Sequence, residues 1–207
     1  ANDMGRLAYR MGMKETAEKL FSHYLARHPQ SHEGANNLAC ALRDQGRFAD
    51  AIEILRPAIA AHPEHSLLWN TLGTVMSEQG DPVNALVFFE EALRQDAGFA
   101  KARYNRGNMR RAMGEIAASL VDCETALRQT TLESERQMMR LSRSTILINL
   151  GRSGEGWDDY EARLHPQFAD STQFITDRPS WRPGEALAGK SLLVIGEQGL
   201  GDEILFA

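Results

Sequence analysis

Polar side chains recur at a fixed interval, and their amide groups could hold a peptide backbone. Asp3, Asn37, Thr71 and Asn105 follow one another at intervals of 34 residues, and Asn70 stands next to the third of them. An amide offers both a donor and an acceptor to a peptide unit, so a row of asparagines would bind an extended chain with little preference for its sequence. The same residues could instead only hydrate an exposed helix face, and both interpretations stay open.

A second group is basic and lies within one short segment. It consists of Lys101, Arg103, Arg106, Arg110 and Arg111, with no acidic residue before Gly114. Arg106 takes the place of a leucine one and two intervals earlier, so we expect it to pair with a nearby carboxylate rather than remain a partly buried free charge. Lys101, Tyr104, Asn108 and Arg111 are predicted to face an acidic peptide or a terminal carboxylate. The net charge of −5 argues against nucleic acid as the partner.

Neither a metal site nor a disulfide framework is predicted. The histidines mostly fall at expected helix ends and connections, where a solvated position explains them. The six are His23, His28, His32, His62, His65 and His165. Cys40 and Cys123 are far apart, which favours two reduced thiols in a cytoplasmic protein. The sequence contains no run of about 18 apolar residues and no charged-then-apolar leader, so we expect no membrane segment.

A repeat of 34 residues in the sequence predicts the helices that position these side chains. Gly46, Gly80 and Gly114 mark it, and small residues recur in register around each of them. Small residues let two helices approach closely, while a large side chain such as Phe89 fills the gap towards the next copy. Asp81-Pro82 is typical of a helix cap followed by proline in the first helical position. The sequence therefore predicts a stack of helical hairpins.

This pattern resembles the tetratricopeptide repeat, whose residues are matched by Trp69, Leu72, Gly73, Ala85, Phe89 and Ala92. The resemblance implies an all-α class, an α-solenoid of about five hairpins over residues 1–165. The first copy is expected to begin before residue 1, and the fifth, whose Gly151 comes late, to be an atypical cap. The expected helices are 1–11, 14–28, 32–45, 48–61, 66–79, 82–95, 100–113, 116–129, 133–150 and 153–164.

The helical pattern ends at about residue 165. An irregular linker is expected over 166–189, followed by a short apolar run, Ser191 to Ile195, that is typical of a buried strand. Glycines and an expected helix at 203–207 complete one strand–turn–helix unit. We interpret 190–207 as the truncated start of a Rossmann-like lobe, whose open strand edge could support self-association.

Three segments, 154–163, 181–190 and 197–207, resemble the junction of bacterial proteins in which tetratricopeptide repeats lead into a glycosyltransferase domain related to the heptosyltransferases. The resemblance implies a nucleotide sugar as donor for the complete protein and Asp202 as the base that activates the acceptor hydroxyl. Alternatively, Asp202 only caps the helix that begins near Glu203. The chain itself is expected to be inactive and to hold no cofactor, because the nucleotide-binding lobe is absent.

The function expected from these patterns is protein binding. The concave groove would take an extended peptide or protein acceptor through Asn37, Asn70, Asn105 and the Lys101 group, as the N-terminal part of a bacterial protein glycosyltransferase. The asparagine row resembles the one in the repeats of O-linked N-acetylglucosamine transferase. By analogy, a bacterial surface or flagellar protein is the acceptor to test. The alternative is a stand-alone adaptor or co-chaperone-like scaffold with no enzymatic role.

Overall fold

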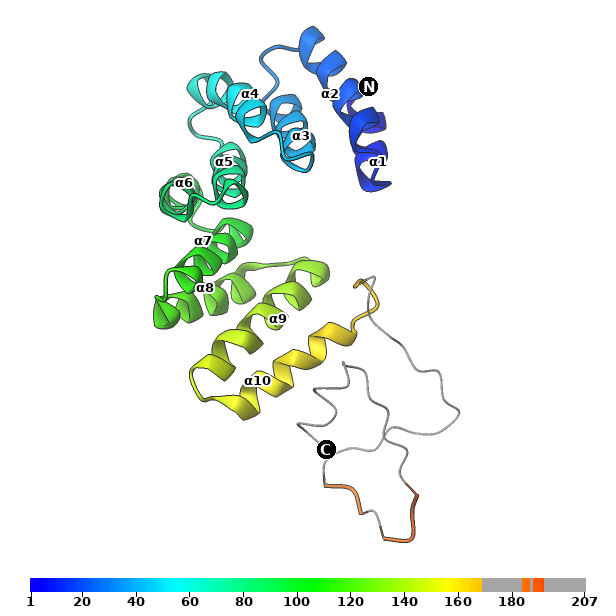
Figure 1. Ribbon diagram of the computed structural model, residues 1–207, viewed down its shortest axis with the longest axis vertical. Helices are drawn as coiled ribbons and strands as arrows, with labels where there is room; N and C mark the ends of the chain where they lie inside the picture. Colours follow the sequence, from blue (N-terminus) through cyan, green and yellow to red (C-terminus); the bar gives the residue numbers. More distant parts are fainter. Residues whose placement is uncertain (169–183, 187, 192–207) are drawn as a thin grey trace. The chain divides into compact units, whose positions relative to one another are not determined.

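The computed structural model describes residues 1–168, 184–186 and 188–191, and within this part it is helical (Figure 1). The chain divides into two compact units, Ala1–Ala162 and Arg163–Ala207. The first unit contains the predicted helical hairpins. The predicted strand after its first residue, Ser191, its glycine turn, the last helix and Asp202 lie in residues 192–207, outside the described residues.

The hairpins are formed by ten α-helices and end in a short 3-10 helix. They are α1 Asn2–Arg10, α2 Lys14–Arg27, α3 His32–Arg43, α4 Phe48–Ala61, α5 Ser66–Gln79, α6 Pro82–Gln95, α7 Ala100–Ala112, α8 Ile116–Gln129, α9 Glu133–Asn149, α10 Ser153–Tyr160 and η1 Glu161–Leu164. We call the odd-numbered helices the first helices and the even-numbered helices the second helices of their hairpins. The all-α solenoid predicted from the sequence is confirmed, and the helix expected at 153–164 changes to 3-10 geometry after Tyr160.

The turn glycines have the backbone conformation that their position requires. Gly46, Gly80, Gly114 and Gly151 have φ angles of 74°, 90°, 83° and 75°. A residue with a Cβ rarely adopts this left-handed conformation, so glycine ends the first helix and turns the chain into the second. Gly151 does so although it comes three residues late, and the fifth hairpin therefore keeps the same turn.

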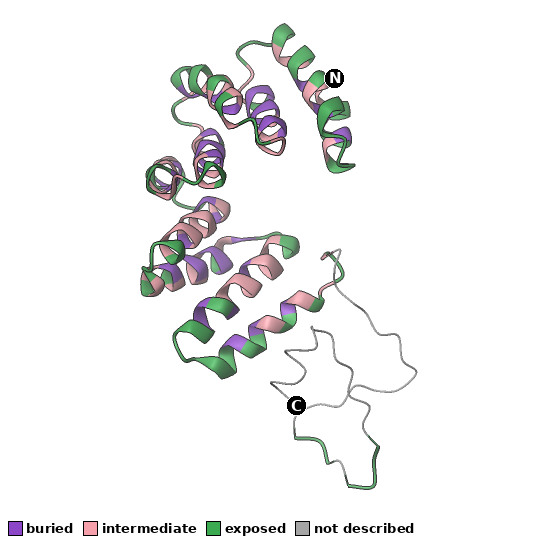
Figure 2. Cartoon of the chain, viewed as in Figure 1, coloured by how far each residue is buried: buried purple, intermediate pink, exposed green. Residues whose placement is uncertain are grey.

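In the first and third hairpins, close packing between the two helices depends on a glycine under an aromatic ring. A Cβ added to Gly73 on α5 would lie 2.6 Å from Cε1 of Phe89 on α6, and Gly5 and Phe21 make the same pair in the first hairpin. Phe89 is 1% exposed and Phe21 is equally buried. Figure 2 shows the buried residues, coloured purple, along the helices of the array.

The order of helix contacts places the first helices on one face. Each first helix contacts the next one, α1 with α3, α3 with α5, α5 with α7 and α7 with α9, whereas second helices contact only the first helices before and after them. In Figure 1, α3 and α5 lie on the inner side of the curve and α4 and α6 on its outer side. The first helices therefore line the concave face of the array.

Candidate peptide-binding surface

Charge divides between the two sets of helices. The first helices carry eleven lysines and arginines against five acidic residues, whereas the second helices carry six against eleven. The chain as a whole has a net charge of −5, so its basic residues are concentrated on the helices that line the concave face, where several of them pair with carboxylates of the second helices. A basic face of this kind attracts acidic groups and steers their approach.

The basic residues predicted on α7 fall into two groups: arginines that make ion pairs with carboxylates, and residues that could contact a ligand. Arg103, Arg106 and Arg110 make the ion pairs of this helix in the described part of the chain. Lys101 instead places its Nζ 5.6 Å from the centre of the Tyr104 ring, and burial lowers the pKa of this lysine, partly offset by Glu135. Tyr104 and Asn108 are half-buried and Arg111 is exposed. The predicted Lys101 group is thus assembled on one helix.

Arg106 finds the carboxylate that its position requires. Nε and Nη2 of Arg106 donate to the two oxygens of Asp122 at 2.9 and 2.5 Å, and Nη1 of Arg110 donates at 2.8 Å. Asp122 lies on α8 and is 1% exposed. The expected structural role of Arg106 is confirmed. Its partner was not identified from the sequence, because Asp122 stands where the three preceding copies have apolar residues.

The same ion-pair arrangement recurs in the fifth hairpin. Arg143 and Arg140 on α9 contact the buried carboxylate of Asp159 on α10, with Nε of Arg140 at 3.1 Å. Arg143 and Asp159 each follow their counterparts in the fourth hairpin by 37 residues, the same interval that separates Gly151 from Gly114. The two networks are therefore equivalent, and they fix the second helix against the first.

The asparagines form hydrogen bonds between neighbouring first helices. Asn37 donates to Asn2 at 3.1 Å, Asn105 donates to Asn70 at 2.9 Å, and Asn108 accepts from Ser142 at 3.0 Å. Helices one repeat apart lie side by side, so residues about 35 positions apart meet. Asn37, Asn105 and Asn108 are half-buried, whereas Asn70 is only 7% exposed. Part of the predicted row is therefore engaged within the array, and contact with a peptide stays a prediction.

A cavity opens on the first-helix side at the beginning of the array. Its volume is about 250 Å³, and it is lined by Arg6, Tyr9, Arg10, Phe21, Asn37 and Cys40. Tyr9 donates to Asp44 at 2.5 Å, which fixes the ring at the wall of the cavity. Two arginines beside an amide and an aromatic surface suit an acidic side chain on an extended peptide.

The two cysteines are free and unreactive in character. Burial raises the pKa of the Cys123 thiol to about 12, and burial also raises the pKa of Cys40. The thiolate is the reactive form of cysteine, so neither residue is suited to act as a nucleophile near neutral pH.

The stacked hairpins, with their first helices along the concave face, define a helical-repeat protein of the class that presents an extended concave surface. Residues 3–31 and 36–98 match family models of the tetratricopeptide repeat, so this part of the chain is built from tetratricopeptide repeats. Among the described residues, no helix combines the length and apolar character needed to cross a bilayer.

Known proteins resemble the chain in two ways. The Protein FlbA of Caulobacter vibrioides is 49% identical over all 207 residues, and the chain spans only 35% of that relative's length. The structure resembles TTC0263, a tetratricopeptide repeat protein of Thermus thermophilus, with a TM-score of 0.71 and 20% identity over 82% of this chain and 91% of that one. YrrB has a TM-score of 0.54 and 14% identity over 80% and 84%.

Proposed function

We propose that the concave face binds an extended, acidic segment of a protein partner. The observation that carries this proposal is the excess of basic residues on the first helices of an acidic chain. Complementary charge gives such an interface its orientation and its rate of association. YrrB is a tetratricopeptide repeat protein with an unusual peptide-binding site, which supports a peptide ligand for this fold.

Two places on the face would hold the segment. Arg6, Arg10 and Asn37 line the cavity at the beginning of the array. Lys101 and Arg111 on α7 would pair with carboxylates further along the segment, and Tyr104 and Asn108 supply an aromatic surface and an amide beside them. Asn105 reaches the same face, while the buried Asn70 would act by holding Asn105 through its hydrogen bond.

Neutralising Lys101 and Arg111 on α7 is expected to weaken binding of an acidic peptide. The double variant Lys101→Gln/Arg111→Gln should lower the affinity for a synthetic peptide of alternating Ser and Glu about tenfold, or about 1.4 kcal/mol. Exposed ion pairs each contribute up to about 1 kcal/mol, so two pairs account for this loss. Fluorescence anisotropy of the labelled peptide measures the effect.

The matched control is Lys19→Gln/Arg27→Gln, which removes the same charge from exposed positions on the second helix α2. It should leave the affinity nearly unchanged, and raising the salt concentration should weaken binding to the unmodified chain. Equal losses in the two double variants would mean that only net charge matters and that α7 forms no specific site.

We further propose that the array recruits the acceptor of a bacterial protein glycosyltransferase. The support is the resemblance of the segments within 154–207 to the start of such a domain, and the length of the curated relative, which leaves room for a catalytic region. The acceptor would lie along the array with its hydroxyl presented to a nucleotide sugar. A stand-alone adaptor remains the alternative function.

Replacing Asp202 by asparagine in the complete protein is expected to reduce sugar transfer by about 10²–10⁴-fold. Asparagine keeps the shape of the side chain and removes the carboxylate that would accept the proton of the hydroxyl. Transfer of radiolabelled sugar to protein measures this loss, with Glu203→Gln as the neighbouring control. Wild-type turnover of the Asp202→Asn protein would show that this residue is not the base.

A further inference from the structure

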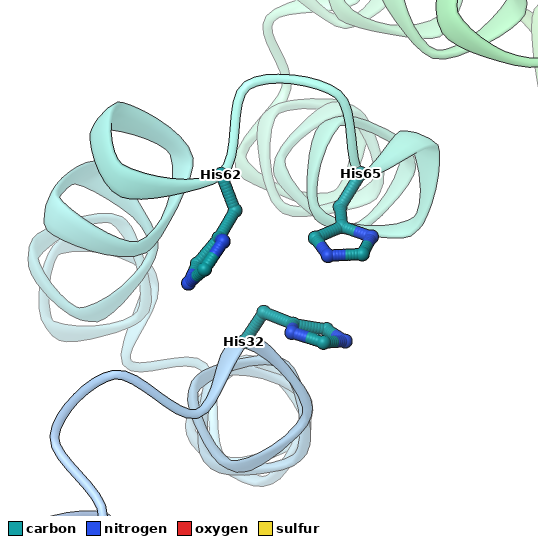
Figure 3. A group of neighbouring side chains, drawn as sticks. All are labelled: His32, His62 and His65. Carbon is teal, nitrogen blue, oxygen red and sulfur yellow. The ribbon is translucent and has the colours of Figure 1, made fainter.

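Three of the six histidines meet where the second copy joins the third (Figure 3). His32 is the first residue of α3, His62 follows the end of α4, and His65 precedes α5. His32 and His65 stack with their ring centres 3.8 Å apart, and His62 lies 5.4 Å from each. Their sequence spacing suggested solvated residues, but α3 and α5 lie side by side and bring them together.

The ring nitrogens are close enough to share an ion. One nitrogen from each histidine lies within 4.8 Å of the other two. In a tetrahedral site with metal–nitrogen bonds of about 2.0–2.1 Å, neighbouring nitrogens are about 3.3 Å apart. All three side chains are half-buried rather than enclosed, so the rings can rotate, and binding would require His32 and His65 to leave their stacked arrangement and turn their nitrogens towards one ion.

The hydrogen bonds around the cluster select the right form of His62. Its Nε2 lies 3.1 Å from the carbonyl oxygen of Gln30, which can only accept, so Nε2 carries the proton and Nδ1 keeps a lone pair. A backbone carbonyl holding the second ring nitrogen is the usual support of a metal-bound histidine. Oε1 of Glu64 lies 3.7 Å from this Nδ1 and 3.6 Å from Nε2 of His65.

We propose that His32, His62 and His65 bind one divalent transition-metal ion, with Glu64 as the fourth ligand. Three imidazoles with one carboxylate suit Zn²⁺ and related ions, whereas Mg²⁺ and Ca²⁺ prefer oxygen ligands. The ion would join α3, α4 and α5 and so fix the junction between two copies of the array. The site is separate from the proposed peptide contacts of α7 and does not depend on the proposed function.

The neutral form of the histidines is the one that binds metal. Binding should weaken as the pH falls below about 6.5, where free histidine takes up a proton.

Isothermal titration of the 207-residue chain with ZnCl₂ tests the proposal. The chain and the control His23→Gln, which changes an exposed histidine on α2, should each bind one ion and melt at a higher temperature with Zn²⁺ than without it. His65→Gln and His32→Gln should lower the affinity at least about tenfold, since each removes a ligand. Circular dichroism of the metal-free variants checks that they are folded.

Two results would overturn the proposal. One is a chain that takes up no Zn²⁺ and shows no change in melting temperature at neutral pH. The other is an affinity of folded His65→Gln and His32→Gln equal to that of His23→Gln, which would place any bound Zn²⁺ at other groups.

Discussion

Replacement of Phe89 by alanine is expected to lower the free energy of unfolding by about 3–5 kcal/mol. The ring is 1% exposed and lies against Gly73, where no Cβ could be accommodated. Alanine would leave a cavity between α5 and α6 that neither helix can close, because the backbone of α5 already rests on the ring. Urea unfolding followed by circular dichroism measures the loss.

The same helix offers the control for this prediction. Val87 on α6 is 54% exposed, and Val87→Ala should change stability by no more than about 0.5 kcal/mol. A cost below about 1 kcal/mol for Phe89→Ala would contradict the packing described between these helices. A larger effect at Val87 than at Phe89 would contradict the assignment of faces on α6.

Replacement of Asp122 by alanine should cost about 3 kcal/mol or more. Its buried carboxylate accepts hydrogen bonds from Arg106 and Arg110, and Arg103 lies 3.9 Å away. Alanine leaves several partly buried guanidinium groups without their shared partner. Urea unfolding of this variant measures the cost, and Asp158→Ala, which removes an exposed carboxylate on α10, should be nearly neutral.

A compensating change separates charge from packing at this position. Leucine occupies the equivalent of Arg106 in the two preceding copies, at positions 38 and 72, and is buried there. The double variant Asp122→Leu/Arg106→Leu should therefore recover part of the stability that Asp122→Ala loses. If both variants were equally unstable, the uncompensated charge of Arg106 would not be the cause.

The features predicted correctly from the sequence are those that repeat. Turn glycines such as Gly80 recur every 34 residues, because each copy must solve the same turn, and a small residue stands at the position of Gly73 in each copy. The large side chain was expected to fill the gap towards the next copy, whereas Phe89 lies on Gly73 of its own hairpin. The need of Arg106 for a carboxylate also followed, since a charge at a leucine position cannot remain unpaired in a packed interior.

The features that were missed depend on contacts between copies. The meeting of His32 with His65 depends on α3 lying beside α5. For the same reason Asn70, expected to face a peptide, is buried against α7 and accepts a hydrogen bond from Asn105. Periodicity identifies which residues are equivalent, but the lateral packing of neighbouring copies decides what they contact.

The central claim is that the basic first helices form the binding face. Titration of the ¹⁵N-labelled chain with the alternating Ser-Glu peptide, followed by amide chemical-shift changes, tests it most directly. We expect the changes to concentrate on first helices, around Asn37 on α3 and between Lys101 and Arg111 on α7. Changes confined to second helices such as α4 and α6, or an equal response to a matched Ser-Lys peptide, would contradict the claim.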